Sequence, residues 1–194
     1  MYSINKDELL DIIEYEKVRN DYRKDIIAYK KNRRFTLGPN VTIIFENKKT
    51  LMFQIQEIMR AERLVHDRQI QEEIDVYSSI MPSEKELSAT LFLEVTEEHK
   101  IRSVLDSFIG LSLNNSVYFK IGDRKVYAAF ESGREKEDNI SSVHYIKFPF
   151  DQKAINGLKN NDLKLSLNIN YNEYCYSHEI LDSSRISLQK DLSD

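Results

Sequence analysis

The chain has 194 residues, of which 41% are hydrophobic and 31% are charged, and its formal net charge is −4. This composition is ordinary for a globular protein of about one domain. The net negative charge disfavours a protein whose main task is to coat nucleic acid or an anionic membrane.

The cysteine content and the N-terminal sequence restrict the cellular compartments in which we expect this protein. Cys175 is the only cysteine, which excludes an intrachain disulfide and a cysteine-rich zinc or iron–sulfur site held by this chain alone. The first ten residues, MYSINKDELL, lack the basic and then apolar order of a signal peptide. No run of about 18 apolar residues could span a bilayer. We therefore expect a bacterial-type cytoplasmic protein without a membrane partner, since a free thiol suits a reducing environment.

The first 80 residues carry helical patterns. An apolar and tyrosine-rich stripe recurs every three or four residues up to Lys31 and predicts a long helix packed on a sheet. The basic run KKNRR (30–34) is interpreted as the C-terminal cap of this helix, or else as a site for an anionic partner. Residues 35–46 read as extended around the turn LGPN, Thr50 is the expected N-cap of a second helix, and a third helix is expected at 68–79.

The second half carries alternating patterns that are typical of antiparallel strands. Strands are expected at 89–95, 117–121, 126–130, 141–150 and 163–171, with a helix at 97–109 and a solvated loop at 131–139. This order predicts an α+β fold, with a long N-terminal helix and two to three further helices packed on one mostly antiparallel sheet. We expect a single domain over 1–181, helix-rich in 1–80 and strand-rich in 86–181, and over 182–194 a frayed tail or else a loosely docked helix.

The second helix contains an unusual polar stretch, FQIQEIMRAER (53–63). On a helical projection Glu62 lies within about 20° of Leu51 and Ile55, so we expect it on the buried stripe with a polar partner. If the helix continues, His66 follows one turn later. A structural polar network is the favoured interpretation. The alternatives are a ligand site, an acid–base group, or a metal site in which Glu62 and His66 are the only candidate ligands.

Known catalytic signatures are missing from the sequence. There is no phosphate-binding GxxxxGK[ST] loop, no GxGxxG after a strand and no GxSxG elbow, and neither HExxH nor a ferritin-type Glu-x-x-His occurs. Cys175 is expected to be a buried, inert thiol, and His144 a hydrogen-bonded core histidine. No cofactor is predicted.

The chain carries five strings in the order of a known family: EYEKVR (14–19), KKNRR (30–34), FENKKTLMFQIQEIMRAER (45–63), ELSATLF (86–92) and SSVHYIKF (141–148). Together they resemble the uncharacterised bacterial family called domain of unknown function 3501, over most of residues 5–150. Where the family has an asparagine shortly before Pro82, this chain has Ser78-Ser79. By position, the resemblance assigns the family's polar signature to Arg33, Arg34, Glu46, Asn47, Thr50, Gln54, Glu57, Arg60, Glu62 and Arg63.

The resemblance implies a context rather than a reaction. Members are often encoded beside a rubrerythrin-like protein and an iron–sulfur oxidoreductase similar to heterodisulfide reductase subunits. The leading hypothesis is therefore a non-enzymatic accessory protein that docks on such a redox partner, with Arg60, Arg63 and the pair Arg33-Arg34 on the contact surface. The alternative is an enzyme or small-anion-binding protein that uses the Glu, Arg and Gln side chains of the 50–66 helix. Nucleic-acid binding by the basic part of the first helix is a third, less favoured reading.

Overall fold

A computed structural model describes residues 3–136 and 138–192, and it confirms the predicted α+β class. Helices predominate in the first 80 residues, and every strand pair in the described ranges is antiparallel. No helix within these ranges is both long and apolar enough to cross a membrane.

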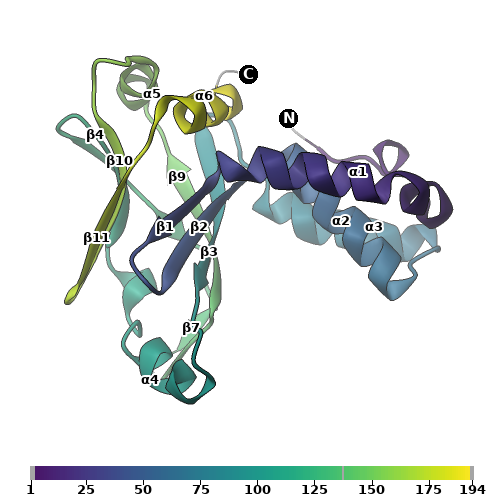
Figure 1. Ribbon diagram of the computed structural model, residues 1–194, viewed down its shortest axis with the longest axis horizontal. Helices are drawn as coiled ribbons and strands as arrows, with labels where there is room; N and C mark the ends of the chain where they lie inside the picture. The colour runs from purple at the N-terminus through teal and green to yellow at the C-terminus, as the bar shows by residue number, and fades with distance from the viewer. Residues whose placement is uncertain (1–2, 137, 193–194) are drawn as a thin grey trace.

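Three consecutive helices project together from the sheets and are called the helical arm (Figure 1). They are α1 (Ile12–Lys31), α2 (Lys48–Glu62) and α3 (Asp67–Ile80), preceded by the short turn η1 (Lys6–Glu8). The N-cap of α2 is Asn47 rather than the predicted Thr50. The Asn47 side chain accepts a hydrogen bond from the Thr50 amide, and the Thr50 hydroxyl accepts one from the Asn47 amide. This reciprocal arrangement satisfies two backbone donors that the helix itself leaves free.

The strands form two main sheets instead of the single predicted sheet. The larger sheet has the order β1-β2-β3-β9-β6, and the smaller has the order β11-β10-β4-β5. A two-stranded ribbon, mostly in the segment predicted as a loop, and several short helices lie at the ends of the two sheets (Figure 1). The larger sheet comprises β1 (Arg34–Leu37), β2 (Val41–Glu46), β3 (Glu86–Leu93), β6 (Ala129–Phe130) and β9 (Val143–Pro149). The smaller sheet comprises β4 (Val117–Ile121), β5 (Arg124–Tyr127), β10 (Leu165–Tyr171) and β11 (Tyr174–Glu179). The remaining elements are the ribbon strands β7 (Glu135–Lys136) and β8 (Asn139–Ile140) and the short helices η2 (Glu98–Lys100), α4 (Ile101–Asp106), η3 (Leu111–Leu113), α5 (Gln152–Lys159) and α6 (Asp182–Asp191).

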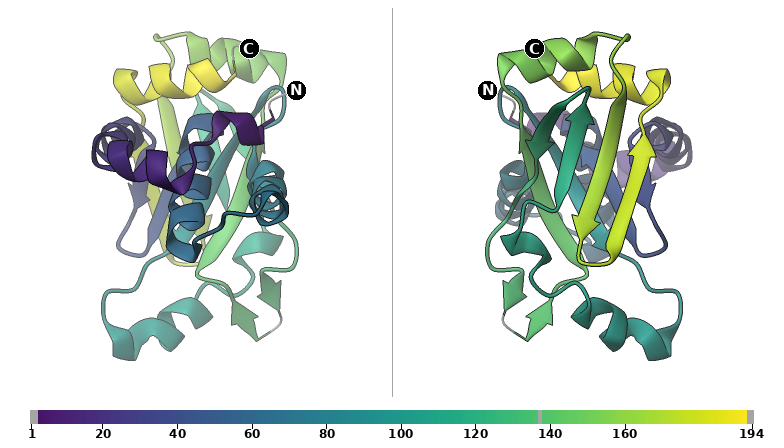
Figure 2. Two further views of the ribbon diagram at one scale, coloured as in Figure 1. Left: turned by 90° about the vertical axis from the view of Figure 1, so that its right-hand side faces the viewer. Right: turned by 90° about the vertical axis from the view of Figure 1, so that its left-hand side faces the viewer.

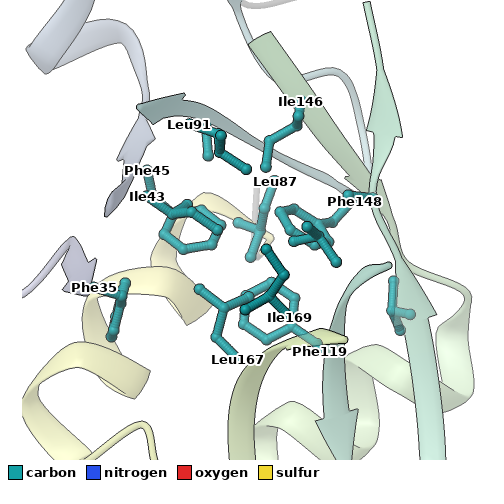
Figure 3. Packing of buried hydrophobic residues seen from close by; sticks show 14 of the residues in the cluster. Phe35, Ile43, Phe45, Leu87, Leu91, Phe119, Ile146, Phe148, Leu167 and Ile169 are labelled. Atoms are coloured by element: carbon teal, nitrogen blue, oxygen red, sulfur yellow. The ribbon is translucent and has the colours of Figure 1, made fainter. Parts of the chain in front are cut away.

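The main hydrophobic core lies between the two sheets (Figure 3). Alternate residues of each strand point inward, as the period-two patterns require. The ring of Phe119 lies 5.5 Å from that of Phe45 and 4.8 Å from that of Phe148, so side chains of both sheets interdigitate. The smaller sheet has its other face uncovered in the right-hand view of Figure 2, while the arm lies on the far side of the larger sheet.

The arm has a second core of its own, built from the apolar stripes of α2 and α3. The tyrosine-rich stripe of α1 was expected to pack on a sheet, but it packs on α2. Tyr15 is fully buried, and the ring of Tyr22 meets that of Phe53 edge-on at 5.7 Å. A two-helix contact suits this stripe because the tyrosine hydroxyls reach polar groups on the neighbouring helix.

Two predictions about the second half are wrong. Residues 182–191 form the helix α6, which was the alternative to a frayed tail, and this helix is firmly docked rather than loose, because Leu188 and Leu192 insert into the main core. Its Arg185 donates hydrogen bonds to the carbonyl of Leu158 in α5 and to the carbonyl of Leu163 in the segment after α5. The predicted helix at 97–109 is shorter and broken, with α4 ending at Asp106. The helix α5 was not predicted.

Candidate functional site

The polar side chains predicted as one site separate into two groups on the arm. One group lies at the base of the arm, where α1, β2, α2 and α6 meet. The other bridges α1 and α2 along their length. We describe each group from its residues upward.

Arg33 organises the base of the arm and is buried. It follows α1 directly, and its Nε donates to the Phe45 carbonyl at 2.9 Å. Its remaining donors reach α6, where they form an ion pair with Asp191 and hydrogen bonds with Ser187. The sequence placed Arg33 on a contact surface. That prediction is wrong, because a fully buried, paired guanidinium cannot meet a partner.

Glu46 and Asn47 complete this group. The side-chain amide of Asn47 donates to the Tyr29 hydroxyl at 2.8 Å and to the Asp191 carboxylate at 2.9 Å, so it links α1, α2 and α6. Glu46 is 2% exposed; its Oε2 lies 3.7 Å from the Lys30 ammonium and has no hydrogen-bond donor within the described ranges. The group is a junction between the arm and the sheets, with a carboxylate and an ammonium at its centre.

Glu57 holds α1 and α2 together by a bidentate contact. Its carboxylate oxygens accept from the Arg19 guanidinium at 2.7 and 2.8 Å, and one also accepts from the Tyr15 hydroxyl at 2.7 Å. The Arg19 hydrogen bonds lower the pKa of Glu57 despite its partial burial. Burial and the contact with Glu57 raise the pKa of Tyr15. This Glu57 is a stabilised anion, the opposite of a carboxyl tuned to give up a proton near neutral pH.

The other predicted residues of α2 do not join a common site. Arg60 pairs with Glu16 of α1 at 2.5 Å. Gln54 is half-buried, and Arg34 forms an exposed pair with Glu94 at 3.0 Å. Gln56 was not singled out from the sequence, yet it is buried and hydrogen-bonded to both the amide and the carbonyl of Leu10.

The predicted arrangement of Glu62 and His66 is wrong. Glu62 is exposed at the last residue of α2, although the nearby Met59 and Leu64 are buried. Arg63, also exposed, adopts a left-handed conformation with φ of 56°, and His66 becomes the N-cap of α3. The two side chains therefore do not share a helix face. Throughout 3–136 and 138–192, no three His, Cys, Asp or Glu side chains gather as metal ligands.

Two further predictions concern single residues. Cys175 is exposed rather than buried, since it lies on the open face of β11, where its Sγ is 3.0 Å from Asn170 Oδ1. His144 is buried as expected, with Nε2 at 2.8 Å from the Ser141 carbonyl, and burial lowers its pKa. Its Nδ1 lacks a hydrogen-bond partner in the part of the chain that the structure describes.

The sequence identified the first helix as partly basic, but it did not show that exposed cations gather on the face of α1 that points away from α2. At 100° per residue, exposed side chains with seven-residue spacing lie in line along this face. Two exposed isoleucines alternate there with cations, and a further cation lies beside them. We call this surface the basic stripe; it comprises Ile13, Lys17, Asn20, Arg23, Lys24, Ile27 and Lys31.

The charges of the basic stripe are mostly unused within the molecule. Lys17, Arg23 and Lys31 form no ion pair with any described residue. Lys24 pairs with Asp21 at 3.1 Å, but both side chains are more than three-quarters exposed, so this pair contributes little. The spacing of Lys17, Lys24 and Lys31 was the sequence signal that could have revealed the stripe.

Comparison with known proteins agrees with the resemblance seen in the sequence. The family described as "protein of unknown function (DUF3501)" matches residues 3–192, so the chain belongs to it. The structure is similar to the crystal structure of a protein of unknown function from Burkholderia pseudomallei K96243, with a TM-score of 0.90 and 28% identity. That match covers 99% of this chain and 100% of the other. No curated protein matches the sequence.

Proposed function

We propose that this member of the family is a non-enzymatic docking protein that binds an acidic protein surface through the basic stripe of α1. The observation that carries the proposal is the set of three unpaired cations, Lys17, Arg23 and Lys31, beside the exposed Ile13 and Ile27. The proposal includes a cytoplasmic location, which the single thiol suits.

The side chains that an enzyme would use support docking over catalysis. Glu57 and Arg60 each meet a partner on α1, and Glu62 lies in solvent. Catalytic groups need to converge on a place where a reacting atom can sit. These three groups do not converge in this way. Glu57 and Arg60 are better explained as links between α1 and α2, and Glu62 as an exposed residue at the end of α2.

The composition of the stripe favours a protein partner over nucleic acid. Ile13 is 73% exposed and Ile27 is 53% exposed, and apolar side chains of this size gain by burial against another protein. Phosphate backbones, by contrast, are bound mainly through cations and hydrogen-bond donors.

The family resemblance guides the choice of partner. It implies a rubrerythrin-like protein or an iron–sulfur oxidoreductase, and these are the two partners that we propose for test. A cationic helix steers an acidic partner towards it, so association should be fast at low salt and slower at high salt.

The test is titration calorimetry of the purified protein with each of the two host partners, at low and high ionic strength. The variant Lys17→Glu/Arg23→Glu/Lys31→Glu should weaken binding about tenfold or more. A matched control, Lys153→Glu/Lys159→Glu/Lys164→Glu, changes the net charge equally at exposed positions on and after α5. It should bind like the unmodified protein.

Two outcomes would contradict the proposal. Equal loss of binding in both variants would show a general effect of net charge rather than a docking surface. Failure of both partners to bind, together with steeply salt-dependent binding of a single-stranded RNA or a DNA duplex, would instead favour the nucleic-acid reading.

A further inference from the structure

The free end of the helical arm holds an apolar hollow. The proposed contact through the cations of the basic stripe gives this hollow no role. Its volume is about 260 Å³, and it is lined by the segment before α1 and by the connection from α2 to α3. Apolar side chains supply most of the wall, with the Lys6–Asp67 ion pair at its rim. The lining residues include Leu9, Leu10, Ile12, Met59, Leu64, Val65 and Ile70.

The hollow combines a buried floor with an exposed apolar rim. Met59 is 3% exposed and Ile70 is 6% exposed, whereas Val65 is 65% exposed. A flexible methionine at the floor adapts to the shape of an inserted group. A cavity of ~150 Å³ lined by apolar side chains accepts one benzene ring, so this hollow has room for one large apolar side chain.

The hollow adjoins the first residue of the basic stripe along α1. Ile12 lines it, the neighbouring Ile13 begins the stripe, and Lys17 follows one turn further along α1. Binding energy in protein interfaces concentrates in a few side chains that fill pockets, while charges around them set orientation and rate. The arm presents both parts of such an interface on adjacent surfaces.

We infer that the hollow receives one apolar anchor side chain, of leucine, methionine or phenylalanine size, from the acidic partner bound at the basic stripe. This inference rests on the proposed docking function and specifies the partner's recognition element. That element is an exposed apolar residue with carboxylates on one side, which meet the cations of α1. A second copy of this chain is the competing occupant.

The test uses methyl NMR of the full chain labelled at its methionines, because Met59 reports on the hollow and Met81, at the base of the arm, serves as a reference. The probe is a synthetic acidic peptide of glutamates and glycines with one central phenylalanine, and the control peptide has serine instead. The phenylalanine peptide should shift the Met59 resonance saturably and leave Met81 unchanged.

Two valine variants separate the hollow from the rest of the arm. Val65→Asp places a carboxylate at the rim and should weaken binding of the phenylalanine peptide about tenfold. Val76→Asp makes the same change at a valine of α3 that is 58% exposed, and it should have no effect. Circular dichroism of both variants checks that the helices remain folded.

Each other outcome overturns the inference in a distinguishable way. If both peptides bind in a salt-dependent manner without moving Met59, the basic stripe docks acidic partners but the hollow holds no anchor. If the Met59 resonance shifts with protein concentration alone, and sedimentation shows a dimer, the occupant is a second copy. If neither peptide binds, the anchor is refuted, and the calorimetry with whole partners decides separately on docking.

Discussion

Replacement of Arg33 tests whether a buried ion pair joins the arm to α6. In Arg33→Ala, Asp191 loses its charged partner while its side chain is only 8% exposed, and the Phe45 and Ser187 carbonyls lose a donor. Removing one member of a buried pair costs about 3–5 kcal/mol, because the other charge stays buried without compensation. We therefore expect the free energy of unfolding to fall by that amount.

The neighbouring arginine provides the control. Arg34 pairs with Glu94 at 3.0 Å, but the two side chains are 53% and 45% exposed. Such a surface pair contributes about 0–1 kcal/mol, so Arg34→Ala should be nearly neutral.

Urea denaturation followed by circular dichroism measures both variants, and the melting temperature of Arg33→Ala should drop by on the order of 10 °C. A fall in stability for Arg33→Ala within about 1 kcal/mol of that for Arg34→Ala would refute the reasoning. The double variant Arg33→Met/Asp191→Leu should recover much of the loss, because neither charge of this pair is then left buried without its partner.

Three further changes test other parts of the fold. Glu57→Gln should cost about 1.5–3 kcal/mol at neutral pH through its charged hydrogen bonds. Because the folded pKa of Glu57 is lowered, its contribution is present above the unfolded value of about 4.3 and is lost as the pH falls through the folded value. Urea titrations at several pH values should show the unfolding free energies of Glu57→Gln and the unmodified protein converging at acid pH; a difference that stays constant with pH would contradict this. Gly38→Ala should destabilise by more than about 1 kcal/mol, because φ is +72° and the new Cβ would lie 2.6 Å from the Tyr176 ring. Gly133→Ala, with φ of +87° and open space around it, should destabilise the protein less than Gly38→Ala does, and thermal melts of both variants measure the difference. Removal of residues 182–194 should lower the melting temperature strongly or prevent folding, since α6 supplies side chains to the main core; a tail-less chain that melts normally would disprove that role.

Local periodicity determined much of the fold without reference to tertiary contacts. Leu165, Leu167 and Ile169 alternate with polar residues, and this pattern fixes both the strand β10 and the face that it buries. Residues 68–79 were predicted as a helix because their apolar positions repeat with the helical period, and α3 spans Asp67–Ile80. The α+β class follows from the order of such elements along the chain.

Other features depended on contacts between distant segments. The residues near Arg33 in sequence do not predict its burial, because Asp191 lies 158 residues away and only the docking of α6 brings the two side chains together. Glu62 shares a direction with Leu51, yet it is exposed at the last residue of α2, because direction on a helix does not specify which positions near its end another element covers. The sequence alone thus determined which faces are apolar. The tertiary structure decided which neighbour covers each face, and it left the basic stripe of α1 uncovered, because α2 packs on the opposite side.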